Sequence, residues 1–493
     1  MTDIPFIMLD DKNSEVPLYR QIYGAIRLSI LNGEFESGKR LPPTRLLAKQ
    51  LGVSRTTVIN AYEQLFAEGY LEGKAGAGTF AAACLPDDFL QTPRVERREN
   101  KPEIPPRKLK LSDFGKTVSK NSRAIVQSNQ ATSYVPFRHG QPAIDKFPFD
   151  VWTKIADKCY YSRRGELFGY GAAAGFYPLR EAVAAHLKSA RGVNCTPEQV
   201  IITSGAKQAF DLIGRIFLES GSEVWIENPC HPGAKQAFQS FGAKLTPVQV
   251  DKDGFDLSAA LRHRRQARLV YVTPSHQFPL GLTMSLPRRL ALLEWARVAE
   301  AWIIEDDYDS EFRYAGRPLA SLQGLDRNGR VIYIGTFSKT IFPALRLGCL
   351  VVPPDLTQIF TAVRALSGTH SPLIDQAILA EFIAEGHFAR HIRRMRTLYQ
   401  ERQQILVKES KRQFDGLLEV SAADAGMHLI GWLPENISDK SVAEKAALAG
   451  LSVAPVSGYS FHQPTRNGLM LGYTAFTEKQ IKEGVRKLAR ILR

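Results

Sequence analysis

Hydrophobic residues near the N-terminus recur every four positions and predict an amphipathic helix over residues 17–32. The inward positions of this helix are expected to be Leu18, Ile22, Ile26 and Ile30. Gly33 follows directly, and a glycine at this point commonly ends a helix because it adopts the left-handed conformation without strain. The chain therefore opens on a short helix with one buried face.

Two shorter helical patterns and a hairpin come next. Thr44 is expected to cap a helix that runs to about Leu51, and Ser54 is expected to cap a third helix over 55–68. The residues expected to face inward from these two helices are Leu46, Leu47, Leu51, Val58, Tyr62, Leu65 and Phe66. A strand opening at 69–71 and a glycine-tipped hairpin closing over 76–80 complete the pattern. The predicted order is helix, helix, turn, helix and wing.

This order is that of a winged helix-turn-helix, in which the third helix reads DNA. The residues of its first turn, which would point into the major groove or at its phosphates, are Ser54, Arg55, Thr56 and Thr57. The further candidates for contacts to the DNA backbone or the minor groove are Arg40, Thr44, Arg45 and the wing glycines Gly76 and Gly78. Periodicity alone leaves open a second interpretation, a small helical protein-interaction domain with solvated arginines.

The hydrophobic rhythm fails over residues 84–131. The prolines that interrupt this interval are Pro86, Pro93, Pro102, Pro105 and Pro106. Between Arg94 and Lys110 the chain has seven basic and three acidic residues. We therefore expect a proline-stiffened, partly extended basic linker between two domains.

From residue 132 onward, apolar runs alternate with helical patterns. The runs predicted as buried strands are 200–203, 223–226, 269–272, 302–305 and 331–334, and helices are predicted over 206–218 and 287–299. Strands that alternate with helices indicate a mainly parallel α/β sheet. Ligands bind such sheets beyond the carboxyl ends of the strands, which is where the candidate residues for chemistry fall.

Two of these candidate segments can be interpreted from chemistry alone. Ser204-Gly205-Ala206 opens a helix whose free N–H groups could hold a phosphate, although glycine-led helix starts are common. Asp306 follows the strand at 302–305, and a buried carboxylate there needs a partner such as the pyridinium nitrogen of pyridoxal phosphate (PLP). Tyr308 could donate to the phenolic oxygen of the same cofactor. A structural acidic turn is the alternative for this stretch.

The third candidate is a lysine. Lys339 stands between small hydroxyl side chains after the strand at 331–334. If it is partly buried near a cation, this lysine has a lowered pKa and could form an imine with an aldehyde. Arg346 could fork onto a phosphate, with Thr336 and Ser338 nearby. A lone lysine is usually surface charge, but a lysine in this setting is a more specific signal.

Bulk composition narrows the class of protein. The 493 residues suggest two or three domains, and a hydrophobic content of 44% is enough for large cores. The net charge of +14 favours polyanionic partners but also suits a basic enzyme. Charged residues break every apolar run short of a membrane span, and the N-terminus has no secretory pattern. Five scattered cysteines indicate a reducing compartment, so we expect a cytoplasmic protein with no metal site.

The residue strings around the DNA-reading candidates resemble a known family. The strings are Gly38-Lys39-Arg40-Leu41-Pro42-Pro43-Thr44-Arg45, Leu51-Gly52-Val53-Ser54-Arg55 and Glu68-Gly69-Tyr70-Leu71, and they are similar to the winged helix of GntR-type regulators. The resemblance covers residues 15–83. It implies binding to double-stranded operator DNA.

The segment 132–493 resembles fold-type I PLP enzymes, the aspartate aminotransferase superfamily. The motifs that carry this resemblance are Tyr170-Gly171, Ser204-Gly205-Ala206, Asn228-Pro229-x-His231, Thr273 to Gly281, Asp306-x-Tyr308, and Ser338-Lys339 with Arg346. The resemblance implies a mainly parallel large domain, a smaller C-terminal α+β subdomain, and a homodimer with cofactor sites near the subunit interface. A winged helix followed by such a domain resembles the MocR/GabR subfamily of GntR regulators.

The same resemblance implies a role for each motif in PLP binding. Lys339 would form the internal aldimine, Asp306 would pair with the ring nitrogen, and Tyr308 would contact the phenolic oxygen. His231 would stack on the ring, and His276 and Gln277 would also belong to the cofactor site. The phosphate would be held by Ser204, Gly205, Ala206, Thr336, Ser338 and Arg346. Tyr170 would reach the phosphate of a partner subunit.

One residue that the superfamily usually carries is missing. Aminotransferases have an arginine near the C-terminus that clamps the substrate carboxylate, and in this chain Met470 occupies that position. Arg466 is close by but out of register, and Gly233 stands where another arginine could follow His231. An α-amino acid would lack its bidentate partner. The sensed ligand is therefore expected to be PLP itself or an amine without that carboxylate.

These observations favour a transcriptional regulator that senses PLP or an amine through Lys339. A working aminotransferase with a fused DNA-binding domain is the alternative. A third hypothesis is a PLP-independent regulator whose large domain serves only to dimerise. Whether the large domain retains catalysis is left open by the sequence, although a sensing role is favoured.

Overall fold

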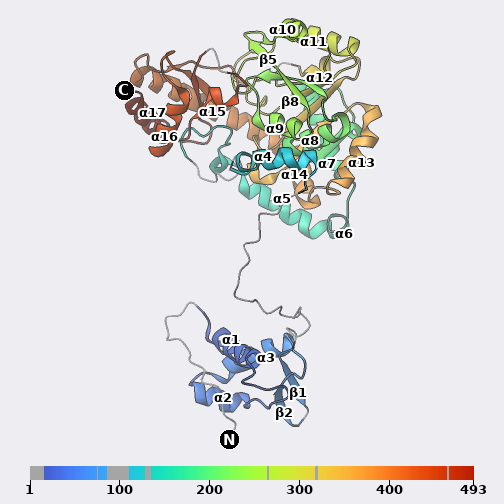
Figure 1. The fold of residues 1–493 in the computed structure, drawn as a ribbon, viewed down its shortest axis with the longest axis vertical. Helices are drawn as coiled ribbons and strands as arrows, with labels where there is room; N and C mark the ends of the chain where they lie inside the picture. The colour runs from blue at the N-terminus through green and yellow to red at the C-terminus, as the bar shows by residue number, and fades with distance from the viewer. Residues whose placement is uncertain are drawn as a thin grey trace. The chain divides into compact units, whose positions relative to one another are not determined.

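The computed structural model describes residues 16–74, 76–85, 110–127, 135–263, 266–316, 320–462 and 466–493. The chain forms two compact units, divided between Leu109 and Lys110 (Figure 1). The first unit is a small domain of three helices and a hairpin, and the second is a large α/β domain, as the sequence predicted. Within the residues described, no helix is long and apolar enough to cross a membrane.

The first unit is a winged helix-turn-helix. Its elements are α1 (Leu18–Leu31), α2 (Thr44–Leu51), α3 (Arg55–Ala67), and the antiparallel strands β1 (Leu71–Lys74) and β2 (Gly78–Ala81). Ile22, Val58 and Leu65 are fully buried between the helices. Gly52 ends α2 in the left-handed conformation, with φ 66°, and so turns the chain toward α3.

Some details expected for this unit are wrong. Thr44 does not cap α2, because Pro43 occupies the N-cap position and Thr44 is the first helical residue. Leu18, Leu46 and Phe66 were expected to face inward but are exposed. Short helices on a small domain bury only one narrow face, so hydrophobic residues on the flank of that face remain in solvent.

The centre of the second unit is an eight-stranded sheet in the order β3-β10-β9-β8-β7-β4-β5-β6. The strands are β3 (Val200–Thr203), β4 (Glu223–Asn228), β5 (Lys244–Asp251), β6 (Gly254–Phe255), β7 (Leu269–Val272), β8 (Trp302–Asp307), β9 (Val331–Thr336) and β10 (Gly348–Val351). All five predicted strands are present, and the neighbours from β9 to β5 pair in parallel. β10 is antiparallel to β3 and to β9, so β3 and β9 point the same way.

Helices cover both faces of this sheet (Figure 1). They are α5 (Phe149–Ser162), α6 (Arg164–Leu167), α7 (Tyr177–Arg191), α8 (Ala206–Phe217), α9 (Pro232–Ser240), α10 (Leu257–His263), α11 (Leu286–Val298), α12 (Leu322–Leu325), α13 (Thr357–Leu366) and α14 (Leu373–Ala384). Phe210, Phe238 and Phe360 fill one interface between helices and sheet, and Trp225 and Phe255 lie in another. Because both faces are buried, the central strands are continuous apolar runs.

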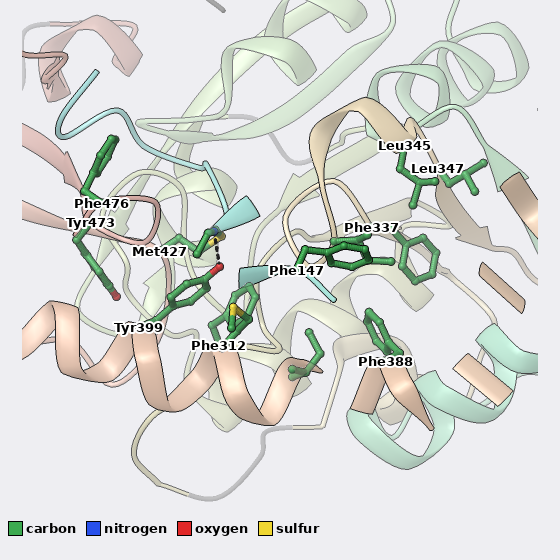
Figure 2. Packing of buried hydrophobic residues seen from close by; sticks show 14 of the residues in the cluster. Phe147, Phe312, Phe337, Leu345, Leu347, Phe388, Tyr399, Met427, Tyr473 and Phe476 are labelled. Atoms are coloured by element: carbon green, nitrogen blue, oxygen red, sulfur yellow. Dashed lines mark hydrogen bonds between the residues drawn. The ribbon is translucent and has the colours of Figure 1, made fainter. Parts of the chain in front are cut away.

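The last part of the chain forms the expected smaller α+β subdomain. Its elements are α15 (His387–Gln413), β11 (Glu419–Val420), β12 (His428–Trp432), α16 (Asp439–Leu448), β13 (Ala454–Pro455), β14 (Gly468–Gly472) and α17 (Glu478–Leu492). The four strands form an antiparallel sheet in the order β11-β12-β14-β13. Its core is continuous with that of the large domain, and Figure 2 shows Phe337 and Phe388 in the same cluster as Tyr399 and Tyr473.

Part of the interval expected to be an extended linker is helical. Residues 110–127 contain α4 (Asp113–Gln127), which contacts α9. The ring centroid of Phe114 lies 5.7 Å from that of Phe241, the residue that ends α9. The expectation of an extended chain is therefore wrong for these residues, because α4 has a surface to pack against. Residues 86–109, with the five prolines, lie outside the described residues, and the domain boundaries stay predictions.

Candidate cofactor site and DNA-reading helix

The residues predicted to carry chemistry follow strands that point the same way. Ser204 follows β3, and Asp306 is the second-last residue of β8. Ser338 and Lys339 follow β9. Because β3, β8 and β9 share one direction, their carboxyl ends meet at one edge of the sheet. The fold thus brings together residues that are more than a hundred positions apart in the sequence.

Lys339 is anchored by a residue that the sequence did not indicate. Its Nζ donates to the carbonyl oxygen of Gly140 at 2.8 Å. Gly140 has φ 69°, and a Cβ at this position would lie 2.7 Å from Nζ, so glycine is needed for the close approach. Burial lowers the pKa of Lys339, the nearby Arg138 lowers it further, and Asp309 and Asp306 oppose the change. The predicted lowering is present, with burial as its main cause.

Asp306 and its neighbour Asp307 point to opposite faces of β8. Asp306 is 5% exposed, accepts a hydrogen bond from the hydroxyl of Tyr271 at 2.7 Å, and has a pKa that burial raises to about 7. Asp307 accepts from Arg191 Nε and from the hydroxyl of Tyr333, each at 2.8 Å. Because side chains alternate along a strand, Asp307 forms a buried ion pair with Arg191 on one face of β8, while Asp306 lies on the other face. No cation is bonded to Asp306 within the described residues.

Tyr308 is held by a histidine from the predicted motif. Its hydroxyl lies 2.9 Å from Nδ1 of His276, and the same nitrogen lies 3.1 Å from a carboxylate oxygen of Asp309. Burial raises the pKa of Tyr308 well above its ordinary value, so the phenol remains protonated and can donate. Gln277 has a different role, because its amide donates to the carbonyl oxygens of Pro229 and Phe278. These bonds tie Gln277 to the turn, and its expected place in the cofactor site stays a prediction.

The expected phosphate-binding residues gather at the start of α8. Arg346 donates from Nη2 to the carbonyl oxygen of Ser204 at 2.8 Å, and a Cβ on Gly205 would lie 3.6 Å from the same guanidinium. Gly205 has φ 94° and directly precedes Ala206, the first residue of α8. Thr336 accepts from the main-chain N–H of Ser338 at 3.3 Å. The segment presents helix N–H groups and a guanidinium, which is the donor set that a phosphate requires.

His231 precedes the first turn of α9. Its imidazole lies with its centroid 5.2 Å from the ring of Phe278, and its buried Nδ1 has no hydrogen-bond partner within the described ranges. Burial lowers the pKa of His231 to about 4, so the ring is neutral at pH 7. A Cβ at Gly233 would lie 2.8 Å from Cε1 of His231. This contact explains why glycine, rather than an arginine, stands there.

Several rings near Lys339 were not predicted. Phe278 lies between the rings of His139, His428 and Tyr459, with centroid distances of 6.1, 6.0 and 5.2 Å. Burial lowers the pKa of His139 to about 3 and that of His428 to about 4. The only signal in the sequence was the motif 273–281, which contains Phe278. His139, His428 and Tyr459 come from distant segments that carried no recognisable pattern.

Met470 lies on the face of the small sheet that carries His428. It pairs with Ile430 across β12 and β14, and residues two apart on a strand share a face, so Met470, Ile430 and His428 lie on one side. Met470 is fully buried. Arg466 is elsewhere: its guanidinium pairs with Glu419 and lies 5.5 Å from the ring of Trp432. The expected equivalence of Met470 with the missing arginine stays a prediction.

Tyr170 is not among the residues gathered at the strand ends. Its side chain is 96% exposed, and its ring centroid lies 6.4 Å from that of His370. The expected contact with a partner subunit stays a prediction.

The first turn of α3 separates a capping pair from exposed residues. Ser54 Oγ accepts from the main-chain N–H of Thr57 at 3.1 Å, and the two hydroxyl oxygens lie 2.8 Å apart. Arg55 and Thr56 are exposed, as are Arg45 on α2 and both wing glycines. Arg40 lies against the wing, since a Cβ at Gly78 would lie 2.9 Å from its Nε. Ser54 and Thr57 thus stabilise the helix, while Arg55 and Thr56 remain free to contact DNA.

Comparison with known proteins identifies the family. Residues 18–81 match the family model for bacterial regulatory proteins of the gntR family, and residues 132–488 match aminotransferase class I and II. The probable rhizopine catabolism regulatory protein MocR of Rhizobium meliloti is 40% identical over 478 residues, which span 97% of this chain and 94% of that protein. The chain belongs to the MocR subfamily of GntR-type transcriptional regulators.

Other similar proteins match either the whole of this MocR-type regulator or its large unit. The pyridoxine biosynthesis transcriptional regulator PdxR of Corynebacterium glutamicum is 30% identical over 489 residues, which span 98% of this chain and 97% of that protein. The α-aminoadipate aminotransferase LysN of Thermus thermophilus superposes with a TM-score of 0.71 at 29% identity and covers 78% of this chain and 98% of its own. The large unit therefore has the fold-type I aminotransferase fold, and the winged helix indicates DNA binding.

PLP is the cofactor of this aminotransferase family, and the site residues of the MocR-type regulator fit it. A buried carboxylate with a raised pKa suits a protonated ring nitrogen, because the ion pair offsets the cost of burying the charge. The amine of Lys339, which lies against Gly140 and is half-buried, suits the aldehyde of PLP. Helix N–H groups beside Arg346 suit a phosphate. The chemistry of this donor set matches each polar group of PLP.

Proposed function

We propose that this MocR-type regulator binds PLP on Lys339 and that PLP, alone or after exchange with an amine, changes its binding to operator DNA. The observation that carries the proposal is the convergence of Lys339, Asp306, Tyr308 and Arg346 at one sheet edge, in a chain whose first unit is a winged helix. The residues suit a covalent but reversible ligand, and the fused unit suits a readout on DNA.

Each residue has a distinct task in this proposal. Lys339 supplies the amine, and its lowered pKa leaves more of it unprotonated and nucleophilic at neutral pH. Asp306 holds a proton on the ring nitrogen, and Tyr308, positioned by His276, donates to the phenolic oxygen. Arg346 and the first turn of α8 hold the phosphate. When bound, PLP supplies an aldehyde carbon that reacts reversibly with amines.

The ligand class follows from the small subdomain. Its site-facing positions include Met470 and His428, and the lowered pKa of His428 keeps that imidazole neutral at pH 7. A carboxylate brought against this face would lack the arginine that aminotransferases carry at the position of Met470, and burying a carboxylate without such a partner is costly. We therefore propose PLP itself, or an amine without an α-carboxylate, as the sensed molecule.

A ligand alters DNA binding only if it binds two arrangements of the chain with different affinity. α4 offers a physical route for such coupling, since Phe114 packs on Phe241 and any side chain at Gly214 on α8 would collide with the Phe241 ring. α8 begins at the expected phosphate-binding segment, and α9 begins next to His231. The helix nearest the DNA-binding unit in sequence therefore packs on α9, and the Phe241 ring that it contacts also lies against α8; both α8 and α9 begin at the proposed cofactor site.

We also propose that the protein acts as a homodimer, with Tyr170 reaching the phosphate of the partner subunit. The exposure of its ring supports this role. A dimer would present two winged helices to paired half-sites on the operator. Sedimentation of the wild type and of Tyr170→Ala would show whether this residue serves dimerisation, and titration of both proteins with PLP by absorbance would show whether it serves cofactor affinity.

The decisive experiment combines absorbance with DNA binding. Addition of PLP to the purified protein should produce the visible Schiff-base band and change the affinity for an operator fragment. Lys339→Ala should abolish both effects, whereas the exposed surface variant Lys482→Ala should keep both. A wild-type protein that forms the band but binds the operator equally with and without PLP would contradict regulation by PLP alone.

A catalytically active aminotransferase is the second candidate, and the retention of Lys339, Asp306 and Tyr308 in one site favours it. Met470, at the position where aminotransferases carry an arginine that binds the substrate carboxylate, disfavours it for amino-acid substrates. Sustained transfer of an amino group to a keto acid, abolished by Lys339→Ala, would support this function. The two functions can be measured in the same preparation.

A further inference from the structure

A buried arginine next to the phosphate-binding segment is incompletely paired. Arg364, near the end of α13, is 1% exposed. Its Nη2 donates to Ser371 Oγ at 3.2 Å, but Nε and Nη1 have no hydrogen-bond partner within the described residues. A buried guanidinium that lacks an anion is costly, so such a group is rarely kept without a counter-charge.

The hydroxyl that Arg364 contacts leads directly to the expected phosphate site. Ser371 Oγ lies 3.3 Å from Ser204 Oγ, and Ser204 is the first residue of the phosphate-binding segment. The main-chain N–H of Ser204 donates to Gln208, and its carbonyl oxygen accepts from Arg346. The hydroxyl group is therefore the part of Ser204 that is left to contact a ligand.

The chemistry of these three groups permits a chain of hydrogen bonds toward the ligand. A guanidinium can only donate, so Ser371 Oγ accepts from Arg364. In the pair formed by Ser371 Oγ and Ser204 Oγ, either hydroxyl can donate. A phosphate accepts hydrogen bonds, so when bound it would draw the hydrogen of Ser204 toward itself and leave Ser371 as the donor to Ser204 Oγ.

We propose that Arg364 is a positioning residue for the cofactor phosphate, acting through Ser371 and Ser204, and that the phosphate is the counter-charge for its buried guanidinium. The inference rests on the proposed role of Ser204 in holding PLP. Two arginines would then serve the phosphate. Arg346 is exposed and bonds the main chain of Ser204, whereas Arg364 is buried and reaches Ser204 through Ser371. The phosphate of the ligand, rather than its aldehyde or ring, is the group that Arg364 serves.

The test compares PLP with pyridoxal, which carries the same ring and aldehyde without the phosphate. Schiff-base formation on Lys339 is titrated by absorbance for both ligands. Arg364→Met should weaken the apparent affinity for PLP by about tenfold or more, because a charge-assisted hydrogen-bond chain is lost. Its affinity for pyridoxal should be unchanged. Arg364→Lys should recover part of the loss, and Ser371→Ala should reproduce most of it.

A matched control separates this role from general packing. Arg402 on α15 is also buried, at 5% exposure, and donates to the carbonyl oxygen of Thr474 in the small subdomain. Arg402→Met should lower the stability but leave the ratio of PLP affinity to pyridoxal affinity unchanged. If Arg364→Met leaves the ratio of PLP affinity to pyridoxal affinity unchanged, whether both affinities fall equally or neither falls, the proposal is overturned. If Arg364→Met does not fold, Arg364→Lys and Ser371→Ala carry the same comparison.

The design keeps this proposal distinct from the proposed function. A wild-type protein that forms no Schiff base with either ligand would refute the cofactor role of Lys339 itself. If the wild-type protein binds both ligands, and the Arg364 and Ser371 variants leave the ratio of PLP affinity to pyridoxal affinity unchanged, only the role of Arg364 is refuted.

Discussion

Lys339 donates a hydrogen bond to the carbonyl oxygen of Gly140, 199 positions earlier in the chain, at 2.8 Å. The contact fixes the amine before any ligand arrives. It also makes Gly140 part of the site, because a Cβ there would lie 2.7 Å from Nζ. Neither residue type indicates the pairing by itself.

The first prediction concerns this contact. Gly140→Ala should displace the amine of Lys339 and so reduce the affinity of the protein for PLP and for pyridoxal to the same extent. Part of any effect will be backbone strain, because Gly140 has φ 69°. Gly450→Ala is the control, since Gly450 has φ 74° and no atom within 4 Å of an added Cβ. Equal Schiff-base titrations for the two variants would show that the contact with Lys339 is unimportant.

The second prediction concerns pH. Burial raises the pKa of Asp306 from 3.8 to about 7, so the folded state binds more protons than the unfolded state between these values. The contribution of Asp306 to stability should therefore fall as pH rises through this window, by an amount on the order of a few kcal/mol. Asp306→Asn should remove this slope, as measured by denaturant unfolding at a series of pH values.

PLP provides the internal control for the pH prediction. A protonated ring nitrogen beside Asp306 favours the ionised carboxylate, so saturating PLP should flatten the slope of the wild type. The slope of Asp306→Asn should not respond in this way. A wild-type slope that is identical with and without PLP would mean that the carboxylate does not face the ring nitrogen.

The third prediction separates two neighbours at the start of α3. Arg55→Ala should weaken operator binding by about 1–3 kcal/mol if Arg55 reads a base, with little effect on stability. Ser54→Ala should instead cost about 1 kcal/mol of stability, because the N–H of Thr57 loses its acceptor. Arg490→Ala, an exposed arginine on α17, is the control for loss of charge. Unaltered DNA binding in Arg55→Ala would move the reading contact elsewhere.

The fourth prediction concerns α4. Phe114→Ala should leave PLP affinity unchanged but reduce the effect of PLP on operator binding, because α4 loses its ring contact with Phe241. Phe149→Ala is matched in exposure, at 47% against 46%, and packs on Phe147 and Phe342 instead. The comparison is made by titrating operator binding at zero and saturating PLP. A similar response in both variants would exclude α4 as the coupling element.

Much of the architecture was predictable because the relevant signals are local. The period of the apolar residues and the turn glycines define the winged helix. Continuous apolar runs define five of the eight strands of the large sheet. Asp306, Tyr308 and Lys339 were found because each lies at or just after the carboxyl end of a predicted strand, and Arg346 was found because it stands shortly after Lys339. The errors at Thr44, Leu18, Leu46 and Phe66 arose where one helix face had to be chosen without knowledge of its neighbours. The helix α4 was missed because its docking surface lies on α9, far away in sequence.

The sequence by itself determined the two kinds of unit, their order, the family and the lysine that we propose as the PLP-binding residue. Only the tertiary structure decided which groups complete the site. Gly140, Tyr271, His139, His428 and Ser371 come from four separate segments and have no common spacing. Periodicity records the face that a residue buries within its own element. The partner that the residue meets there depends on how distant elements pack, which no local pattern encodes.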